Sequence, residues 1–330
     1  MDTERIPVDP RHPEAAVIAR AVTVLLRGGL VAFPTETVYG LGALADDATA
    51  AARIFAAKGR PSYNPLIAHV TDAAMARGLA ARWSDVAERL AGAFWPGPLT
   101  LVVPRDPARI PDVVSAGAPT VALRAPAHPV ARALLAALGR PVAAPSANRF
   151  QSLTATTADH VLKGLDGRID MVLDGGPCPY GIESTVVDAT CDPPEVLRPG
   201  ALSLAALATV IPGVRLRHGV LPDGVAAPSP GMLRKHYAPR GRLVVVPAAE
   251  VSAVALRSPG PVGVVLHGLA VDIPGATVRA LPDDALSYGA GLFAALHALD
   301  DAGCATILVA SVPVSPAWEA VRDRLARASA

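Results

Sequence analysis

The chain has 330 residues, of which 51% are hydrophobic and 4% aromatic, and its formal net charge is +1. This length accommodates two domains of ordinary size, and the composition requires cores built from alanine, valine and leucine. A nearly balanced charge excludes a protein that coats a polyanion over its whole surface. The three cysteines show neither a CxxC pair nor a neighbouring histidine cluster. We therefore expect no zinc site and no disulfide framework.

The first two thirds of the chain alternate between helical and strand patterns. Apolar residues at helical spacing predict helices over residues 13–27, 46–60, 72–80, 84–94 and 128–139. Short apolar runs predict strands over residues 30–35, 66–70, 99–103, 120–124, 141–148, 170–176, 184–189 and 195–200. This alternation predicts an α/β domain over residues 1–217. The charged N-terminus lacks an apolar signal segment and no apolar run is long enough to span a membrane, so we expect a cytoplasmic protein.

Residues 218–241 are rich in proline and glycine and have little periodicity, which is typical of a linker. This segment is longer than most connections in compact domains, which indicates a functional or flexible role. After it, the patterns predict strands at 242–247, 261–266 and 305–310 and helices near 283–302 and 316–328. Residues 242–330 are therefore expected to form a second, smaller α/β domain.

The first polar cluster is FPTETVYGL, residues 33–41, where a predicted buried strand runs into hydroxyls, a carboxylate and a phenol. Ligands of α/β proteins commonly bind at such strand ends. The same residue types are equally typical of a helix-capping turn. The cluster by itself leaves both interpretations open.

The second cluster is KGRPSYNPL, residues 58–66, where Lys58 and Arg60 lie between a helix end and a strand. A guanidinium offers a planar fork for phosphate oxygens and an ammonium offers a compact charge. Alternatively, the two cations satisfy the carbonyl end of the preceding helix. For an isolated Lys-x-Arg, this second interpretation is the more frequent one.

A third cluster, PSAN at residues 145–148, again follows a predicted buried strand. Its Ser146 and Asn148 can bond phosphate oxygens, but both residue types are also standard in β-turns. Arg124 and Arg198 add cations at strand ends, where each alone is as typical of a surface arginine. The sequence contains no GxxxxGK[ST] loop, no GxGxxG after a strand and no GxSxG motif.

Taken in order, these segments resemble a known family. They are GGLVAFPTETVYGLGALADD, KGRPSYNPLIAHV, FWPGPLTLVV, TVALRAPAH, AAPSAN, ESTVVD and VLRPG. Together they resemble the YrdC-like domain of threonylcarbamoyl-AMP synthases, and SPGMLRKHYAPR followed by a small α/β unit resembles the two-domain form. The resemblance covers nearly the whole chain and is strongest over residues 20–240. It implies an α/β fold with a YrdC-like twisted mixed sheet, helices and a basic concave face, plus a smaller Rossmann-like domain.

The family's reaction, as the resemblance implies, combines L-threonine, bicarbonate and ATP into threonylcarbamoyl-AMP and releases pyrophosphate. A partner tRNA threonylcarbamoyl-transferase complex then modifies a tRNA adenosine. The resemblance implies Mg²⁺ carried in with ATP as the cofactor, held by phosphates and water rather than by a protein metal site. It leaves direct contact with tRNA open.

The resemblance also implies roles for individual residues. The catalytic set around the phosphates is Lys58, Arg60, Ser146 and Asn148, and we expect Lys58 to be solvated in the cleft. The ATP set is Lys58, Arg60, Asn64, Thr120, Ser146, Asn148, Thr154, Arg198 and Tyr237. The threonine set is Thr35, His69, Arg124, Ala144 and Ser184, with Arg124 clamping the carboxylate of threonine.

Some features depart from the family or leave alternatives. The family's Ser-Pro-Thr reads Thr154-Ala155-Thr156 here, which keeps a hydroxyl. The linker is expected to close over the nucleotide as a lid through Tyr237, or to be a plain tether. An O-carbamoyltransferase remains an alternative function, although such proteins usually carry extra modules. An RNA-binding module is the other alternative, and the net charge and few aromatics disfavour it.

Overall fold

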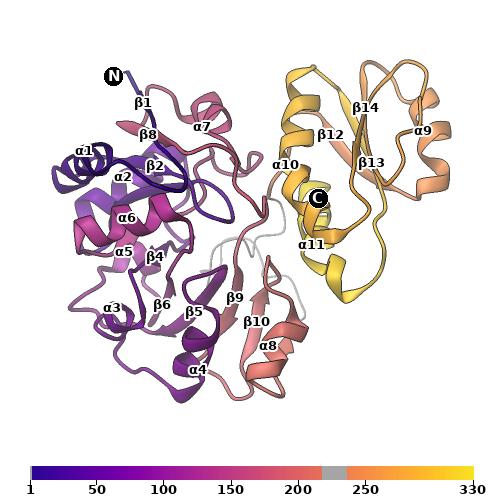
Figure 1. Cartoon of the computed structure of the whole chain (residues 1–330). Helices are drawn as coiled ribbons and strands as arrows, with labels where there is room; N and C mark the ends of the chain where they lie inside the picture. Colours follow the sequence, from indigo (N-terminus) through magenta and orange to yellow (C-terminus); the bar gives the residue numbers. More distant parts are fainter. Residues whose placement is uncertain (1, 218–235) are drawn as a thin grey trace.

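The computed structural model describes residues 2–217 and 236–330, which form two α/β units (Figure 1). Each unit is built around its own sheet, a large mixed sheet in the first and a small parallel sheet in the second. The predicted fold class is therefore confirmed. Most of the predicted linker lies outside the described residues, and only its end, residues 236–241, is described.

Within the described residues, the larger sheet has eleven strands in the order β1-β8-β2-β3-β7-β4-β6-β5-β9-β10-β11. Parallel and antiparallel neighbours are mixed: β4 is parallel to β6, whereas β2 is antiparallel to β3. The strands are β1 Glu4–Pro7, β2 Val31–Phe33, β3 Gly40–Leu44, β4 Ile67–His69, β5 Leu99–Pro104, β6 Thr120–Arg124, β7 Val142–Ala143, β8 Met171–Asp174, β9 Thr185–Asp188, β10 Glu195–Arg198 and β11 Arg215–Leu216.

Helix α2, Ala48–Lys58, has a capping residue at each end. The Asp47 carboxylate accepts hydrogen bonds from the backbone amides of Thr49 and Ala50 at the start of α2. Gly59 ends the same helix with a φ of 64°, which a glycine adopts without strain. The helices are α1 Ala15–Leu26, α2 Ala48–Lys58, α3 Ala73–Arg77, α4 Asp85–Phe94, α5 Asp112–Ser115, α6 Pro129–Leu138, α7 Ala158–Leu165 and α8 Leu204–Val210.

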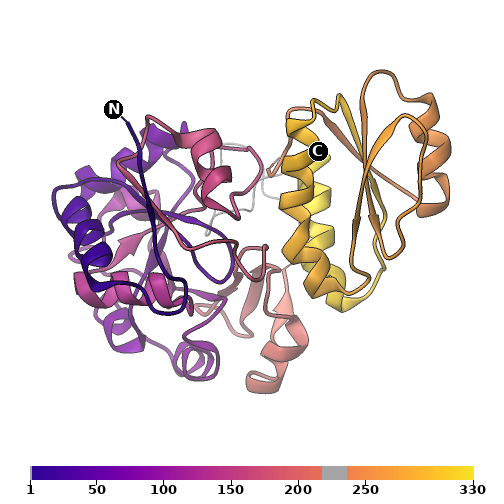
Figure 2. The same cartoon turned by 45° about the horizontal axis from the view of Figure 1, so that its top comes forward.

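The second unit is a four-stranded parallel sheet in the order β12-β15-β13-β14. Helices α10 and α11 cover the face turned toward the first unit, and α9 covers the opposite face (Figure 2). The strands are β12 Arg242–Val246, β13 Val262–His267, β14 Ala276–Leu281 and β15 Thr306–Ala310. The helices are α9 Val251–Arg257, α10 Ala285–Asp301 and α11 Glu319–Ala328, with short 3-10 turns η1 Ala248–Glu250 and η2 Pro316–Trp318.

The two units pack directly against each other through α10. The ring of His297 on α10 stacks on His160 of α7, with centroids 3.8 Å apart. The backbones also approach closely, since a Cβ on Gly181 would lie 2.6 Å from the carbonyl oxygen of Ala290. Only glycine fits at that position. No helix among the described residues is long and apolar enough to cross a bilayer.

Candidate active site

A cleft lies where several strand ends of the large sheet meet the residues that lead into the second unit. Strands β4 and β6 end there at His69 and Arg124, and β9 begins there directly after Ser184. Strand ends of this kind are the usual ligand sites of α/β sheets. The cleft is lined by Thr35, Val38, Tyr39, Gly40, Arg60, Ile67, His69, Arg124, Ala144, Pro145, Ser146, Glu183, Ser184, Arg198, His236 and Tyr237.

All five residues of the predicted threonine set line this cleft. The sheet register explains part of the convergence, because His69 of β4 stands directly beside Arg124 of the parallel β6. His69 is buried, and burial together with the nearby Arg124 lowers its pKa from 6.5 to about 3. The imidazole is therefore neutral at physiological pH. A neutral ring leaves the cationic charge at this end of the cleft to Arg124.

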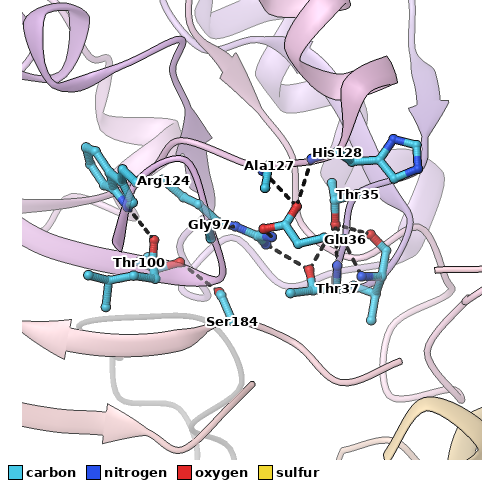
Figure 3. A network of polar contacts seen from close by, with 12 residues as sticks. Thr35, Glu36, Thr37, Gly97, Thr100, Arg124, Ala127, His128 and Ser184 are labelled. Atoms are coloured by element: carbon cyan, nitrogen blue, oxygen red, sulfur yellow. Dashed lines mark hydrogen bonds and ion pairs between the residues drawn. The ribbon is translucent and has the colours of Figure 1, made fainter. Parts of the chain in front are cut away.

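Arg124 is held by a network of short polar contacts (Figure 3). Its Nη2 donates to Oε1 of Glu36 at 2.6 Å, and its Nη1 donates to Oγ1 of Thr37 at 2.9 Å. The other carboxylate oxygen of Glu36 accepts from the backbone amides of Ala127 at 3.0 Å and His128 at 3.3 Å. Glu36 was part of the first polar cluster but had no role assigned in the sequence analysis. The guanidinium is thus fixed in orientation by a carboxylate that is itself anchored to backbone.

The expectation that Lys58 is solvated in the cleft is wrong. The side chain is buried, and its ammonium donates to the carbonyl oxygen of Ser146 at 2.5 Å and to that of Asn148. It therefore bonds the turn at residues 146–148 rather than the end of its own helix. Burial, assisted by the neighbouring Arg60, lowers the pKa of Lys58 well below its usual value. The two hydrogen bonds of Lys58 therefore stabilise the turn at residues 146–148, whose Ser146 lines the cleft.

Arg60 lines the cleft and is also buried. It donates to Oδ1 of Asn64 at 2.6 Å and to the carbonyl oxygens of Asn64 at 3.0 Å and Pro65 at 2.7 Å. All three acceptors are neutral, and within the described residues neither Arg60 nor Lys58 forms an ion pair. Burial lowers the pKa of Arg60 to about 9. Arg60 is thus a buried guanidinium in the cleft wall with no counter-charge among the described residues, which makes this part of the cleft suited to an anion.

Only some of the remaining residues of the predicted ATP set line the cleft. Ser146, Arg198 and Tyr237 line the cleft, whereas Asn64, Thr120, Asn148 and Thr154 do not. Asn148 is buried with its amide nitrogen bonded to the carbonyls of Arg149 and Ser152, and its Oδ1 has no partner among the described residues. Thr120 begins β6, at the end of that strand opposite Arg124.

Glu183 and His236 also line the cleft, and neither had a role among the sequence predictions. Each directly precedes a residue that was selected, Ser184 and Tyr237 respectively. A buried carboxylate among arginines gives no periodic signal in a sequence. Arg198 donates to the carbonyl oxygen of Ser184, the residue that follows Glu183, at 2.8 Å.

The carboxylates at the cleft do not form a cage for a metal ion. Glu36 is engaged by Arg124, and Glu183 accepts from Oγ1 of Thr154 at 2.7 Å and from Arg324 at 2.7 Å. No group of three His, Cys, Asp or Glu side chains in the described part of the chain is arranged to hold a metal. The donor set does not fit a protein-bound divalent cation.

A cleft lined by three buried arginines at the strand ends of a mixed sheet, in a chain that carries a second parallel-sheet unit, defines a two-domain α/β protein with a site suited to an anionic ligand. Residues 23–200 match a family model for Sua5, YciO and YrdC, described as telomere recombination, and residues 202–330 match the C-terminal domain of threonylcarbamoyl-AMP synthase. The chain therefore belongs to the threonylcarbamoyl-AMP synthase family.

Individual relatives agree with this family. The threonylcarbamoyl-AMP synthase of Pyrococcus abyssi is 41% identical over 319 residues, which cover 94% of this chain and 93% of the relative. That of Bacillus subtilis is 44% identical over 228 residues, covering 69% of this chain and 66% of the relative. The crystal structure of P. abyssi Sua5 complexed with L-threonine superposes with a TM-score of 0.94 at 40% identity, covering 99% of this chain and 98% of that one. The similarity therefore extends across both units.

Proposed function

We propose that this chain combines L-threonine, bicarbonate and ATP into L-threonylcarbamoyl-AMP and releases pyrophosphate, for the threonylcarbamoyl modification of a tRNA adenosine. The observation that carries the proposal is the cleft lined by three buried guanidinium groups, those of Arg60, Arg124 and Arg198. At one end of the cleft, the triphosphate of ATP supplies the negative charge that Arg60 lacks among the described residues. At the other end, Arg124 is oriented by Glu36 and pairs with the carboxylate of threonine.

The reaction needs no nucleophile from the protein. The amine of threonine attacks the carbon of bicarbonate, and the hydroxyl group of bicarbonate leaves together with a proton from the amine as water, which gives a carbamate. A carbamate oxygen then attacks the α-phosphorus of ATP, and the bond to the β-phosphate breaks with pyrophosphate as the leaving group. The protein acts by positioning the reactants and by neutralising charge. This requirement matches a cleft rich in guanidinium and hydroxyl groups.

The proposal assigns the two ends of the cleft to the two larger substrates. ATP lies against the loops of the predicted ATP set, with Arg60, Ser146 and Arg198 facing it from the cleft wall. Lys58 contributes indirectly, through the turn that it bonds. Threonine lies against Thr35, His69, Arg124, Ala144 and Ser184, with Arg124 pairing with its carboxylate. Mg²⁺ arrives as the companion of ATP, with phosphate and water oxygens as its ligands.

The test is to incubate the protein with ATP, bicarbonate and L-threonine and to measure pyrophosphate release. We expect release that depends on threonine and on bicarbonate, together with a product of the mass of threonylcarbamoyl-AMP. Equal release without threonine would refute the proposal. A cytoplasmic transferase complex is the proposed recipient of the product, and transfer to tRNA is tested by adding such a complex in a second reaction.

The same assay separates the two alternatives. An O-carbamoyltransferase would consume carbamoyl phosphate and would release no threonine-dependent pyrophosphate. An RNA-binding module would release none with any substrate. Membership of the threonylcarbamoyl-AMP synthase family over both units favours adenylate synthesis over either alternative.

A further inference from the structure

One arginine of the second unit reaches into the wall of the cleft in the first. Arg324 lies on α11, and its side chain is 0% exposed. Its Nε donates to Oε2 of Glu183 at 2.7 Å, and its Nη2 donates to the carbonyl oxygen of Pro199 at 3.0 Å. Its Nη1 donates to Asp323 of the same helix at 2.6 Å. The guanidinium is therefore shared between the two units.

The partners of Arg324 belong to the cleft itself. Glu183 lines the cleft, and its other oxygen accepts from Oγ1 of Thr154 at 2.7 Å. The guanidinium carbon of Arg324 also lies 5.2 Å from the ring centroid of Tyr237, within the range of a cation–π contact. Tyr237 has a φ of 66°. Only about a few per cent of residues other than glycine adopt a positive φ, and the surrounding structure must stabilise it. Arg324 thus contacts two residues that line the cleft, Glu183 and Tyr237.

The electrostatics give this contact a consequence for ligand binding. Burial alone would raise the pKa of Glu183, but Arg324 and Arg198 outweigh burial, and the pKa lies below its usual value. Glu183 is therefore ionised inside a cleft proposed to hold a triphosphate. An unneutralised carboxylate there would repel the phosphates strongly, because the low dielectric of a buried site screens charges poorly. The guanidinium of Arg324 neutralises the charge of Glu183 through their ion pair, although Arg324 itself does not line the cleft.

We propose that Arg324 is a positioning residue through which the C-terminal domain completes the ATP end of the cleft, by neutralising and orienting Glu183 and by holding the ring of Tyr237. The inference rests on the proposed function, since it takes ATP as the ligand. It predicts an effect on nucleotide affinity that a simple structural link between domains would not have. Loss of a structural link would lower the fraction of folded protein and leave the affinity of the folded fraction unchanged.

The experiment uses the full chain with Arg324→Met, which removes the charge at similar length, and Arg324→Lys, which keeps the charge but loses the planar fork. ATP affinity is measured directly by calorimetric titration and, in the pyrophosphate assay, as the KM for ATP. For Arg324→Met we expect the Kd and the KM for ATP both to rise at least about tenfold, which corresponds to roughly 1.4 kcal/mol. The KM for threonine should change less than about threefold, and Arg324→Lys should recover part of the loss.

A double variant separates charge neutralisation from packing. Adding Glu183→Gln to Arg324→Met removes the uncompensated carboxylate, so ATP affinity should recover relative to Arg324→Met alone, a non-additive outcome for residues in contact. The matched control is Arg257→Met, because Arg257 is exposed at the end of α9 on the far side of the second unit. This control should keep the affinity of the wild-type chain for ATP.

The outcomes are decisive for the inference and are separate from the proposed function. A folded Arg324 variant with the wild-type affinity for ATP overturns it, and so does a double variant whose loss is the sum of its parts. If Arg324→Met does not fold, Arg324→Lys decides by the same criterion. A wild-type chain without threonine-dependent pyrophosphate release refutes the proposed function, while the direct titration still reports on Arg324.

Discussion

The guanidinium of Arg124 and the carboxylate of Glu36 form an ion pair 2.6 Å long, with exposures of only 4% and 8% for the two side chains. A pair this deeply buried is costly to desolvate, and it is retained only where its geometry is well satisfied. Here Glu36 is also bonded to two backbone amides, so Arg124 is held in one orientation before any ligand arrives. Such preorganisation is what a specific carboxylate clamp requires.

Replacing the clamp should change threonine binding selectively. In Arg124→Lys the charge remains but the planar fork is lost, so we expect the KM for threonine to rise about tenfold while the KM for ATP changes little. Steady-state pyrophosphate release at varied threonine measures this effect. Arg132→Lys, at an exposed arginine on α6, is the matched control. An unchanged threonine dependence in Arg124→Lys would refute the clamp.

Lys58 should contribute to stability as well as to activity. In Lys58→Met the carbonyls of Ser146 and Asn148 lose their donor, and each buried unsatisfied group costs about 1–3 kcal/mol. We expect a lower thermal midpoint and a higher KM for ATP, because the turn that carries Ser146 is loosened. Lys163→Met, at a partly exposed lysine paired with Asp300, should cost no more than about 1 kcal/mol. A Lys58→Met chain with the wild-type thermal midpoint would contradict this role.

The buried neutral His69 should make the fold sensitive to acid. Its pKa is about 3 in the folded chain and 6.5 as an unperturbed group, so between these values the unfolded chain binds the extra proton. Stability is therefore complete above pH 6.5 and falls as the pH drops toward 3, by up to about 1.4 kcal/mol per pH unit for one proton. Urea unfolding of His69→Gln between pH 7 and pH 4 should show a shallower decline. His12→Gln, at an exposed histidine, should keep the wild-type slope.

The hydroxyl of Tyr237 should matter for ATP and not for folding. It is buried without a hydrogen-bond partner among the described residues, so its removal in Tyr237→Phe should leave the thermal midpoint unchanged or raise it. We expect this hydroxyl to bond the nucleotide. The KM for ATP of Tyr237→Phe should then rise about five- to tenfold, which corresponds to the loss of a hydrogen bond of roughly 1 kcal/mol or more. Tyr288→Phe removes a similarly unpartnered hydroxyl in the core of the second unit and should leave the KM for ATP unchanged.

Elements with strong periodicity were predictable, and those defined by their neighbours were not. The helix predicted over residues 46–60 is α2, Ala48–Lys58, and the strand predicted over 120–124 is β6. By contrast, β3, Gly40–Leu44, is buried along its whole length and shows no alternation, so it was missed. Short elements such as β1 and α8 were missed for a related reason, because their stability comes from packing rather than from local pattern.

The sequence by itself determined the fold class and the two sheets through local patterns, and most of the selected cleft residues through the ordered motifs that resemble a known family. Only the tertiary structure decided what those side chains do. It turned Lys58 away from solvent toward the 146–148 turn, and it paired Arg124 with Glu36. It also brought Arg324 to Glu183 across 141 positions of sequence. Contacts between buried charges depend on where distant backbone segments are packed, and no local pattern encodes that distance.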